Sequence, residues 1–245
     1  MKATALEFRL RFLIHAVIYV LGFTVPWDLV WHFDATGPNA HTWGFLAAML
    51  SKYGLANIGL AFDILLVVGI VFAVLGAGLR TWGAAYLGSS IVKDAGMHGD
   101  RVVADGPYRR MRNPLYLGTF LHTFALALLM PPSGAVFCIV LIGLFQLRLI
   151  FGEEPFLAAK LGTVYEAYKA KVPRLLPAVM PRVPASGRPA VWPQAVLGEV
   201  YFWGVAGSFA VVGWRYNAFL LTKCVVVSLG VSLVARAFVV KKAAE

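Results

Sequence analysis

The stretch LYLGTFLHTFALALLMPPSGAVFCIVLIGLFQLRLIF, residues 115–151, decides the fold of this chain. It is apolar over most of its length and is broken at Pro131, Pro132, Ser133 and Gly134, residue types that favour turns. Each half approaches the ~20 residues that an α-helix needs to cross ~30 Å of hydrocarbon. The stretch therefore predicts a membrane-embedded helical hairpin.

Similar apolar runs lie on both sides of this hairpin. Of the 245 residues, 60% are hydrophobic and only 14% are charged, and the mean hydropathy is +0.74. A soluble domain carries a charged fraction of about 25%. We therefore expect an all-α, polytopic integral membrane protein. Its six transmembrane helices are expected at about 12–31, 55–79, 114–130, 134–151, 196–214 and 217–238, with a short interfacial helix near 44–50.

The formal net charge of +10 is distributed unevenly between the two sides of the membrane. With six crossings, almost all basic residues outside the spans fall on one side, and only Lys52 and Arg215 fall on the other. The positive-inside rule makes the first side cytoplasmic, together with both termini, and indicates an inner or cytoplasmic membrane. The same charges can rest on anionic headgroups, and no nucleic-acid-binding motif accompanies them, so we expect no nucleic acid partner.

The chain divides into three regions by composition. We expect N-terminal spans and the interfacial helix at 1–99, a core made of the hairpin and a cytoplasmic segment at 100–180, and a C-terminal hairpin at 190–245. A proline-rich linker at 181–189 precedes the last region. Cys138 and Cys224 lie in predicted spans with a spacing that fits no zinc site, so we expect no metal.

The segment GPYRRMRNPLYLG, residues 106–118, places polar groups at one end of the hairpin. Asn113 and Pro114 form a typical helix start, because asparagine caps free amides and proline is tolerated at the first helical position. Tyr116 would share a helix face with Arg112 and Asn113. One interpretation is a loop that caps a helix, with arginines on headgroups, and the other is a ligand site.

The segment GEEPFLAAKLGTVYEAYKAKVPRLLP, residues 152–177, supplies further polar groups at the same end. Arg148 lies about one turn before the predicted end of the fourth span, and Glu153 and Glu154 follow it, before an amphipathic stretch at 156–171. Charges this close to hydrocarbon need partners. Either Arg148 pairs with these glutamates to close the helix end, or the charges hold the amine and carboxylate of a ligand.

Together, the two segments resemble the superfamily of isoprenylcysteine carboxyl methyltransferases and phospholipid methyltransferases. Its members share Gly-x-Tyr, then Arg-His-Pro-x-Tyr-x-Gly, a tight helical hairpin, Glu-Glu-x-x-Leu, Gly-x-x-Tyr-x-x-Tyr and Val-Pro. The matching residues are Gly106, Tyr108, Arg112, Asn113, Pro114, Tyr116, Gly118, Glu153, Glu154, Leu157, Gly162, Tyr165, Tyr168, Val172 and Pro173. The resemblance covers roughly residues 100–177.

The resemblance implies a cytoplasmic-side site for S-adenosylmethionine and an acceptor that enters from the membrane. Carried over by position, the cofactor-binding residues are Tyr108, Asn113, Leu115, Tyr116, Glu153 and Glu154. Arg112 and Arg148 would be the catalytic residues, because they would orient or neutralise the acceptor or the cofactor carboxylate. Asn113 stands where the family has histidine, so we expect a positioning role there and not a role as a base.

The implied function is methyl transfer from S-adenosylmethionine to a lipophilic acceptor, with an isoprenylcysteine-type carboxylate as the first candidate. A phospholipid amine or a small thiol is the second candidate acceptor. An NADPH-dependent, sterol-reductase-like enzyme and a non-catalytic lipid-binding membrane protein are the competing hypotheses for the function. Methyl transfer depends chiefly on aligning donor and acceptor and on excluding water, so it needs neither a metal nor a covalent intermediate.

Overall fold

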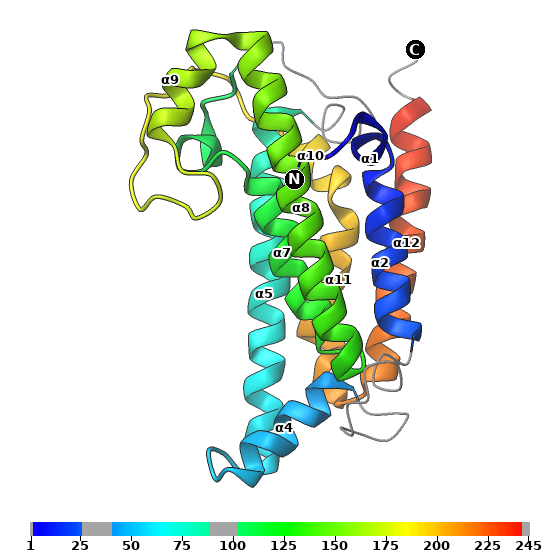
Figure 1. The fold of residues 1–245 in the computed structure, drawn as a ribbon. Coiled ribbons are helices and arrows are strands. Elements are labelled where there is room, and N and C mark those ends of the chain that lie inside the picture. Colours follow the sequence, from blue (N-terminus) through cyan, green and yellow to red (C-terminus); the bar gives the residue numbers. More distant parts are fainter. Residues whose placement is uncertain (1, 26–40, 89–101, 242–245) are drawn as a thin grey trace. The chain divides into compact units, whose positions relative to one another are not determined.

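The computed structural model describes residues 2–25, 41–88 and 102–241, with side chains described up to residue 235 (Figure 1). Every regular element in these ranges is a helix, which confirms the all-α class. The elements are α1 (Ala5–Arg9), α2 (Arg11–Thr24), α4 (Thr42–Lys52), α5 (Ile58–Leu87), η1 (Gly106–Arg109), α7 (Pro114–Ala127), α8 (Pro132–Leu161), α9 (Thr163–Lys171), α10 (Trp192–Gly198), α11 (Val200–Val212), η2 (Gly213–Arg215) and α12 (Ala218–Lys241).

Polar side chains and a proline begin several of these helices. The Thr4 hydroxyl accepts a hydrogen bond from the Glu7 amide, and the Glu7 carboxylate accepts one from the Thr4 amide, so α1 begins with a capping box. The Oδ1 atoms of Asn57 and Asn217 accept amide hydrogen bonds at the starts of α5 and α12. α7 begins at Pro114, as the sequence predicts.

Three helices in the described ranges are long and apolar enough to cross a membrane: α5, α8 and α12 as far as Ala235. α10 and α11 form a pair bent by 69°, which adds a fourth crossing if the pair acts as one span. α2 and α7 have 14 residues each, fewer than the ~20 that a crossing needs. The membrane class is confirmed, whereas the count of six spans is not. The part of the first predicted span from residue 26 onward lies outside the described residues.

α8 extends well beyond the predicted end of the fourth span. It continues from residue 151 through the two glutamates and Pro155 to Leu161, although Pro155 removes one backbone donor. The expected break near residue 151 is therefore wrong, and the next helix, α9, begins only at Thr163. Gly162 separates the two helices with a φ of +58°, which residues with a Cβ rarely adopt.

The described chain folds into two compact units, each assembled from separated parts of the sequence. The first unit comprises Met1–Ile14, Gly78–Thr119 and Gly143–Glu199, and the second comprises His15–Ala77, Phe120–Ile142 and Val200–Glu245. Helices α2, α5, α7 and α8 contribute residues to both units. The division into three regions stays a prediction.

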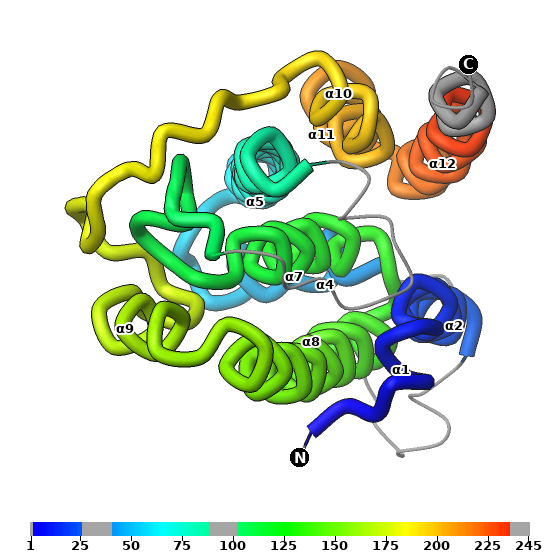
Figure 2. Tube along the Cα trace, turned by 90° about the horizontal axis from the view of Figure 1, so that it is seen from above, coloured from blue at the N-terminus to red at the C-terminus, as the bar shows by residue number. Residues whose placement is uncertain are grey.

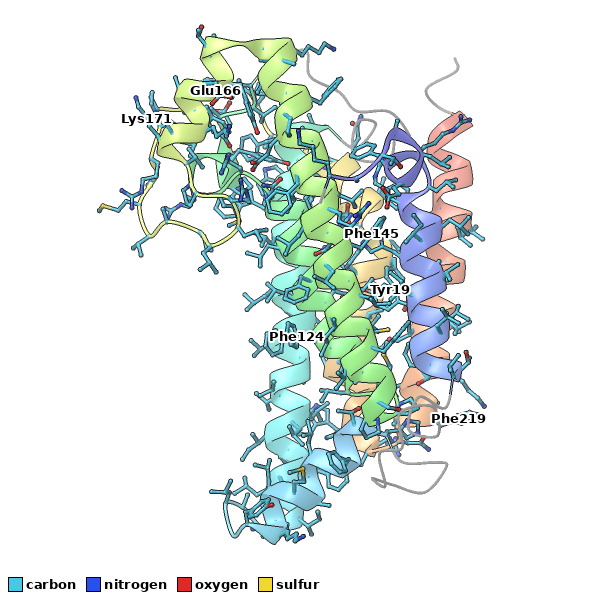
Figure 3. All side chains as sticks on the ribbon, viewed as in Figure 1. Tyr19, Phe124, Phe145, Glu166, Lys171 and Phe219 are labelled. Atoms are coloured by element: carbon cyan, nitrogen blue, oxygen red, sulfur yellow. The ribbon has the colours of Figure 1, made fainter. Side chains whose placement is uncertain are left out.

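The second unit contains a close crossing of α2 and α8. A Cβ on Gly134 would overlap the carbonyl oxygen of Gly22, and a Cβ on Gly22 would overlap the sulfur of Cys138. Small residues allow membrane helices to approach each other in this way. Tyr19 (Figure 3) and Thr123 share a hydrogen bond of 2.7 Å in the same unit.

At one end of the first unit, two loops are joined by backbone hydrogen bonds. The chain between α9 and α10 passes around the loop that carries η1 (Figure 2). Ala178 and Arg182 donate backbone hydrogen bonds to that loop, and Val191 donates one to the end of α5. The buried rings of Tyr165 and Tyr168 in α9 pack against the start of the same loop. All the site residues predicted from the sequence lie in this unit.

Candidate active site

The first motif forms a tight turn beside the end of α5. Gly106 has a φ of +53°, and a Cβ there would overlap the ring of Tyr86, so only glycine fits. η1 follows and buries Pro107 and Tyr108. The carbonyl oxygen of Tyr108 accepts a hydrogen bond of 2.8 Å from the hydroxyl of Tyr168 in α9. The glycine and the tyrosines of the motifs therefore hold this loop against α5 and α9.

Glu154 is the centre of a buried ion-pair cluster. Its side chain is only 6% exposed, and Arg112 Nη1 lies 3.1 Å from its Oε1 atom. Arg174 donates to both carboxylate oxygens through Nε and Nη2, at distances between 2.9 and 3.2 Å. Folding thus joins the two motifs through Arg112 and Glu154. Arg174 was not singled out from the sequence, although it directly follows the Val-Pro pair of the second motif.

Asn113 reinforces the contact between the two motifs. Its Nδ2 atom donates a 3.1 Å hydrogen bond to the carbonyl oxygen of Arg174, and the Arg112 amide donates one of 2.9 Å to the carbonyl oxygen of Pro173. Hydrogen bonding to Glu154 raises the pKa of Arg174, so this guanidinium stays charged. An asparagine can therefore position the arginines without titrating itself.

Glu153 belongs to a separate polar group. The hydroxyl of Tyr116 donates a 3.0 Å hydrogen bond to Glu153, which links α7 to α8. Arg11 is only 8% exposed and lies near enough to act electrostatically on both side chains. Its guanidinium donates to the carbonyl oxygen of Phe8 and covers the rings of Phe8 and Phe12. Sequence reasoning missed Arg11, whose only signal was a basic residue at the start of an apolar run.

Arg148 bonds to a carboxylate that the sequence did not indicate. Its Nη2 atom lies 2.8 and 3.0 Å from the two carboxylate oxygens of Glu7 in α1. The Ala3 amide also donates to the carbonyl oxygen of Arg148. The local partners expected for Arg148, Glu153 and Glu154, are thus replaced by the N-terminal helix. Both side chains of this pair are partly exposed.

A further buried ion pair fixes the end of α5. Arg80 donates through Nε and Nη2 to the two carboxylate oxygens of Glu199, at 2.7 and 3.0 Å. Its Nη1 atom donates to the Thr119 hydroxyl at 2.6 Å and to the carbonyl oxygen of Leu115 at 3.4 Å. The predicted second span ended at about residue 79, but α5 continues to Leu87 and holds Arg80 inside the helix.

Two buried side chains of the first motif have unused hydrogen-bonding capacity. Among the described residues, Arg112 Nε and Nη1 and the Tyr108 hydroxyl make no hydrogen bond, so Nη1 meets Glu154 as an ion pair only. Burial raises the pKa of Tyr108 well above its usual range, so its hydroxyl stays protonated. A buried donor without a partner costs about 1–3 kcal/mol. These groups fit a ligand with acceptor oxygens, such as a carboxylate. In the same ranges, no cluster of His, Cys, Asp and Glu is placed to hold a metal ion.

A comparison with known protein families bears on this geometry. Residues 64–164 match the family model described as phospholipid methyltransferase. That family is part of the superfamily of isoprenylcysteine carboxyl methyltransferase-like integral membrane methyltransferases, so the resemblance is confirmed. No curated protein and no solved structure matches the chain.

The matched segment covers less than half of the chain, but it contains most of the site. It includes Arg80, Arg112, Arg148 and both glutamates of α8. Arg174 lies beyond it, and so do the N-terminal residues that contact Arg148. The match supports a membrane methyltransferase, and the roles of individual residues stay predictions.

Proposed function

We propose that this protein is an S-adenosylmethionine-dependent methyltransferase with a lipophilic acceptor. The observation that carries the proposal is Arg112, which is buried beside Glu154 and has two guanidinium nitrogens without a hydrogen bond among the described residues. A buried, planar, charged donor suits a carboxylate oxygen pair. The family match supports the reaction class, and the long apolar helices support a lipophilic acceptor that would enter from the membrane.

The cofactor would be recognised through its amino-acid end. Arg112 would donate to the cofactor carboxylate, and Glu153 would accept a hydrogen bond from its ammonium group. Asn113 would hold Arg112 in place through its bond to the 173–174 backbone, and Tyr116 would hold Glu153. When bound, S-adenosylmethionine supplies a methyl group on a positively charged sulfur, so no side chain of this chain has to form a covalent bond.

The surrounding residues would keep the site dry and the acceptor aligned. Tyr165 and Tyr168 are buried, and burial raises the pKa of Tyr165 to about 12, so its ring stays neutral. Alignment in water-excluded surroundings is the main source of rate enhancement for such a displacement. Arg148 would contribute by holding α1 through Glu7, which also keeps Arg11 near Glu153.

We infer that the reacting group of the acceptor is a carboxylate of the isoprenylcysteine type. The superfamily to which the matched family belongs is named for such an acceptor, and a carboxylate needs no deprotonation before it attacks the methyl group. A phospholipid amine is the second candidate, because the matched family is described as phospholipid methyltransferase. An amine would have to lose a proton first, and Glu153 would be the buried carboxylate that accepts it.

Cofactor binding tests the reaction class. S-Adenosylhomocysteine should stabilise the detergent-purified, full-length protein by ~2.7 kcal/mol at a hundredfold excess over its dissociation constant, if only the folded state binds it. NADPH should give no shift. A shift with NADPH and none with S-adenosylhomocysteine would assign the chain to the reductase class.

The acceptor is tested with tritiated S-adenosylmethionine and the protein in lipid nanodiscs. N-Acetyl-S-farnesylcysteine and phosphatidylethanolamine are supplied separately, with an acceptor-free reaction as the background. A methyl ester releases volatile methanol in base, whereas an N-methyl group does not. We expect base-labile product with the prenylcysteine. Base-stable product with phosphatidylethanolamine alone would exclude the carboxylate and keep the methyltransferase.

A further inference from the structure

A cavity of about 490 Å³ lies in the first unit, beside the end of α5. Its walls include the aromatic rings of Trp82 and Tyr86 and the charged groups of Asp105, Arg109, Arg110 and Arg188. None of the residues that line it belongs to the Glu154 cluster or to the Glu153 group. The proposed methyl transfer therefore leaves this cavity without a role.

Each of the three arginines of the cavity has more N–H groups than hydrogen bonds within the described residues. Arg109 Nε donates a 2.9 Å hydrogen bond to the carbonyl oxygen of Val183, and Arg110 Nη1 donates to the carbonyl oxygen of Val179. Each guanidinium has five N–H groups, so most of them are left for a ligand. The Arg188 side chain makes no hydrogen bond or ion pair in the part of the chain that the structure describes.

Asp105 is the only acidic residue in the described lining, and residues 186–188 already use its carboxylate. It accepts hydrogen bonds from the Ser186 hydroxyl and from the amides of Gly187 and Arg188. Burial raises the pKa of Asp105, but these hydrogen bonds lower it by more, so the carboxylate is ionised at neutral pH. Its role is to fix the 186–188 turn. Three arginines and one carboxylate leave an excess of two positive charges around the cavity.

The aromatic residues place the cavity where a membrane helix meets water. Trp82 and Tyr86 occupy the last two turns of α5, one of the helices long and apolar enough to cross a bilayer. Tryptophan and tyrosine are enriched at the headgroup level of membranes. Arginine is well suited to phosphate, because its planar fork matches two phosphate oxygens. The volume of the cavity also falls within the ~300–1,000 Å³ typical of ligand sites.

We propose that this cavity binds the phosphate group of an anionic membrane lipid. Arg188 provides the uncommitted donor, and Trp82 and Tyr86 contact the part of the lipid next to the headgroup. A bound lipid would join the 178–188 segment to the loop that carries η1, and Arg112 follows directly on that loop. The proposal is independent of methyl transfer, because its readout is lipid binding.

The test measures binding to the full-length protein in detergent. The probes are dioctanoyl phosphatidic acid, dioctanoylglycerol, which has the same chains without the phosphate, and inorganic phosphate. We expect phosphatidic acid to bind, dioctanoylglycerol to bind at least about tenfold more weakly, and added salt to weaken the phosphatidic acid complex. Inorganic phosphate that displaces phosphatidic acid at equal concentration would overturn the lipid assignment and indicate a site for free phosphate.

Matched variants locate the site. Arg188→Gln should weaken phosphatidic acid binding by about tenfold or more, the typical effect of losing one charge-assisted hydrogen bond. Ala185→Trp, which fills the cavity from an exposed wall, should have the same effect. Arg182→Gln is the control, because Arg182 is an exposed arginine on the same segment that does not line the cavity. Parental affinity in both Arg188→Gln and Ala185→Trp, or an equal loss in Arg182→Gln, would overturn the proposal.

Discussion

At the scale of single residues, Glu154 is the side chain that joins the two motifs. Glu154→Gln should lower the free energy of unfolding by about 2–3 kcal/mol and weaken S-adenosylhomocysteine binding, because two arginines lose their shared carboxylate. The control is Glu166→Gln in α9 (Figure 3), where an exposed pair with Lys169 contributes about 0.5 kcal/mol or less. Chemical denaturation and ligand titration measure both. Equal effects in the two variants would show that the Glu154 cluster contributes no more than an exposed ion pair does.

Arg148 and Glu7 should behave as one unit. Arg148→Met and Glu7→Gln are each expected to cost less than about 1 kcal/mol of stability, because both side chains are partly exposed. If Arg148 acts by holding α1, the two variants should lose methyl transfer to a similar degree, and the double variant should lose no more. Loss of activity in Arg148→Met alone would show that the arginine contacts the reactants directly.

The Asp105 carboxylate should account for part of the stability that the protein loses at acid pH. Its pKa is lowered in the folded state, so its carboxylate stabilises the fold at pH values above its usual range, and this contribution disappears as the pH falls through the lowered pKa. Melting temperatures recorded between about pH 6 and pH 3 should fall less steeply in Asp105→Asn than in the parent. An unchanged slope would show that the hydrogen bonds to the 186–188 turn do not persist in solution.

At the scale of elements, the crossing of α2 and α8 depends on glycine. Gly134→Ala should destabilise the protein by about 1–3 kcal/mol, because the new methyl group overlaps the backbone of Gly22 and the helices must separate. Gly207→Ala in α11 is the control, since a Cβ there meets nothing within 4 Å. Thermal unfolding in detergent distinguishes them. Parental stability in Gly134→Ala would mean that the crossing is looser than described.

The continuation of α8 also has a consequence at this scale. Because the helix runs through Pro155 to Leu161, Glu153 and Glu154 are adjacent helical residues that point in different directions. One meets Tyr116 and the other meets two arginines. The helix therefore fixes the different directions of the two carboxylates, which a loop at the same place would not do.

For the whole molecule, we predict that the η1 loop and the 172–191 segment face the cytoplasm. In a Cys224→Ser background, Tyr53→Cys and Val179→Cys both place a thiol at an exposed position, and the remaining Cys138 is buried. A membrane-impermeant thiol reagent added to intact cells should label Tyr53→Cys. It should label Val179→Cys only after lysis. The reverse pattern would put the site on the side without cytosolic S-adenosylmethionine.

The sequence by itself determined the helical membrane class of this protein and the family that it resembles. Hydropathy is a local property, so apolar runs such as 134–151 predicted membrane helices without knowledge of their neighbours. The helix start at Pro114 is equally local. The spacing of the two motifs predicted the family, which the match over residues 64–164 confirms. Helix ends were not determined locally: the predicted span ended at residue 151, whereas the packed α8 continues to Leu161.

Only the tertiary structure decided which charges meet. Arg148 pairs with Glu7 across 141 residues of sequence, and Arg80 pairs with Glu199 across 119. Ion pairs act through space, so distance along the chain gives no indication of them, and the nearest carboxylates in sequence were the wrong partners for Arg148. The same reason explains why Arg11, Arg174 and the arginine-lined cavity were missed. Their partners come from segments that lie side by side only after the loops have folded onto the helices.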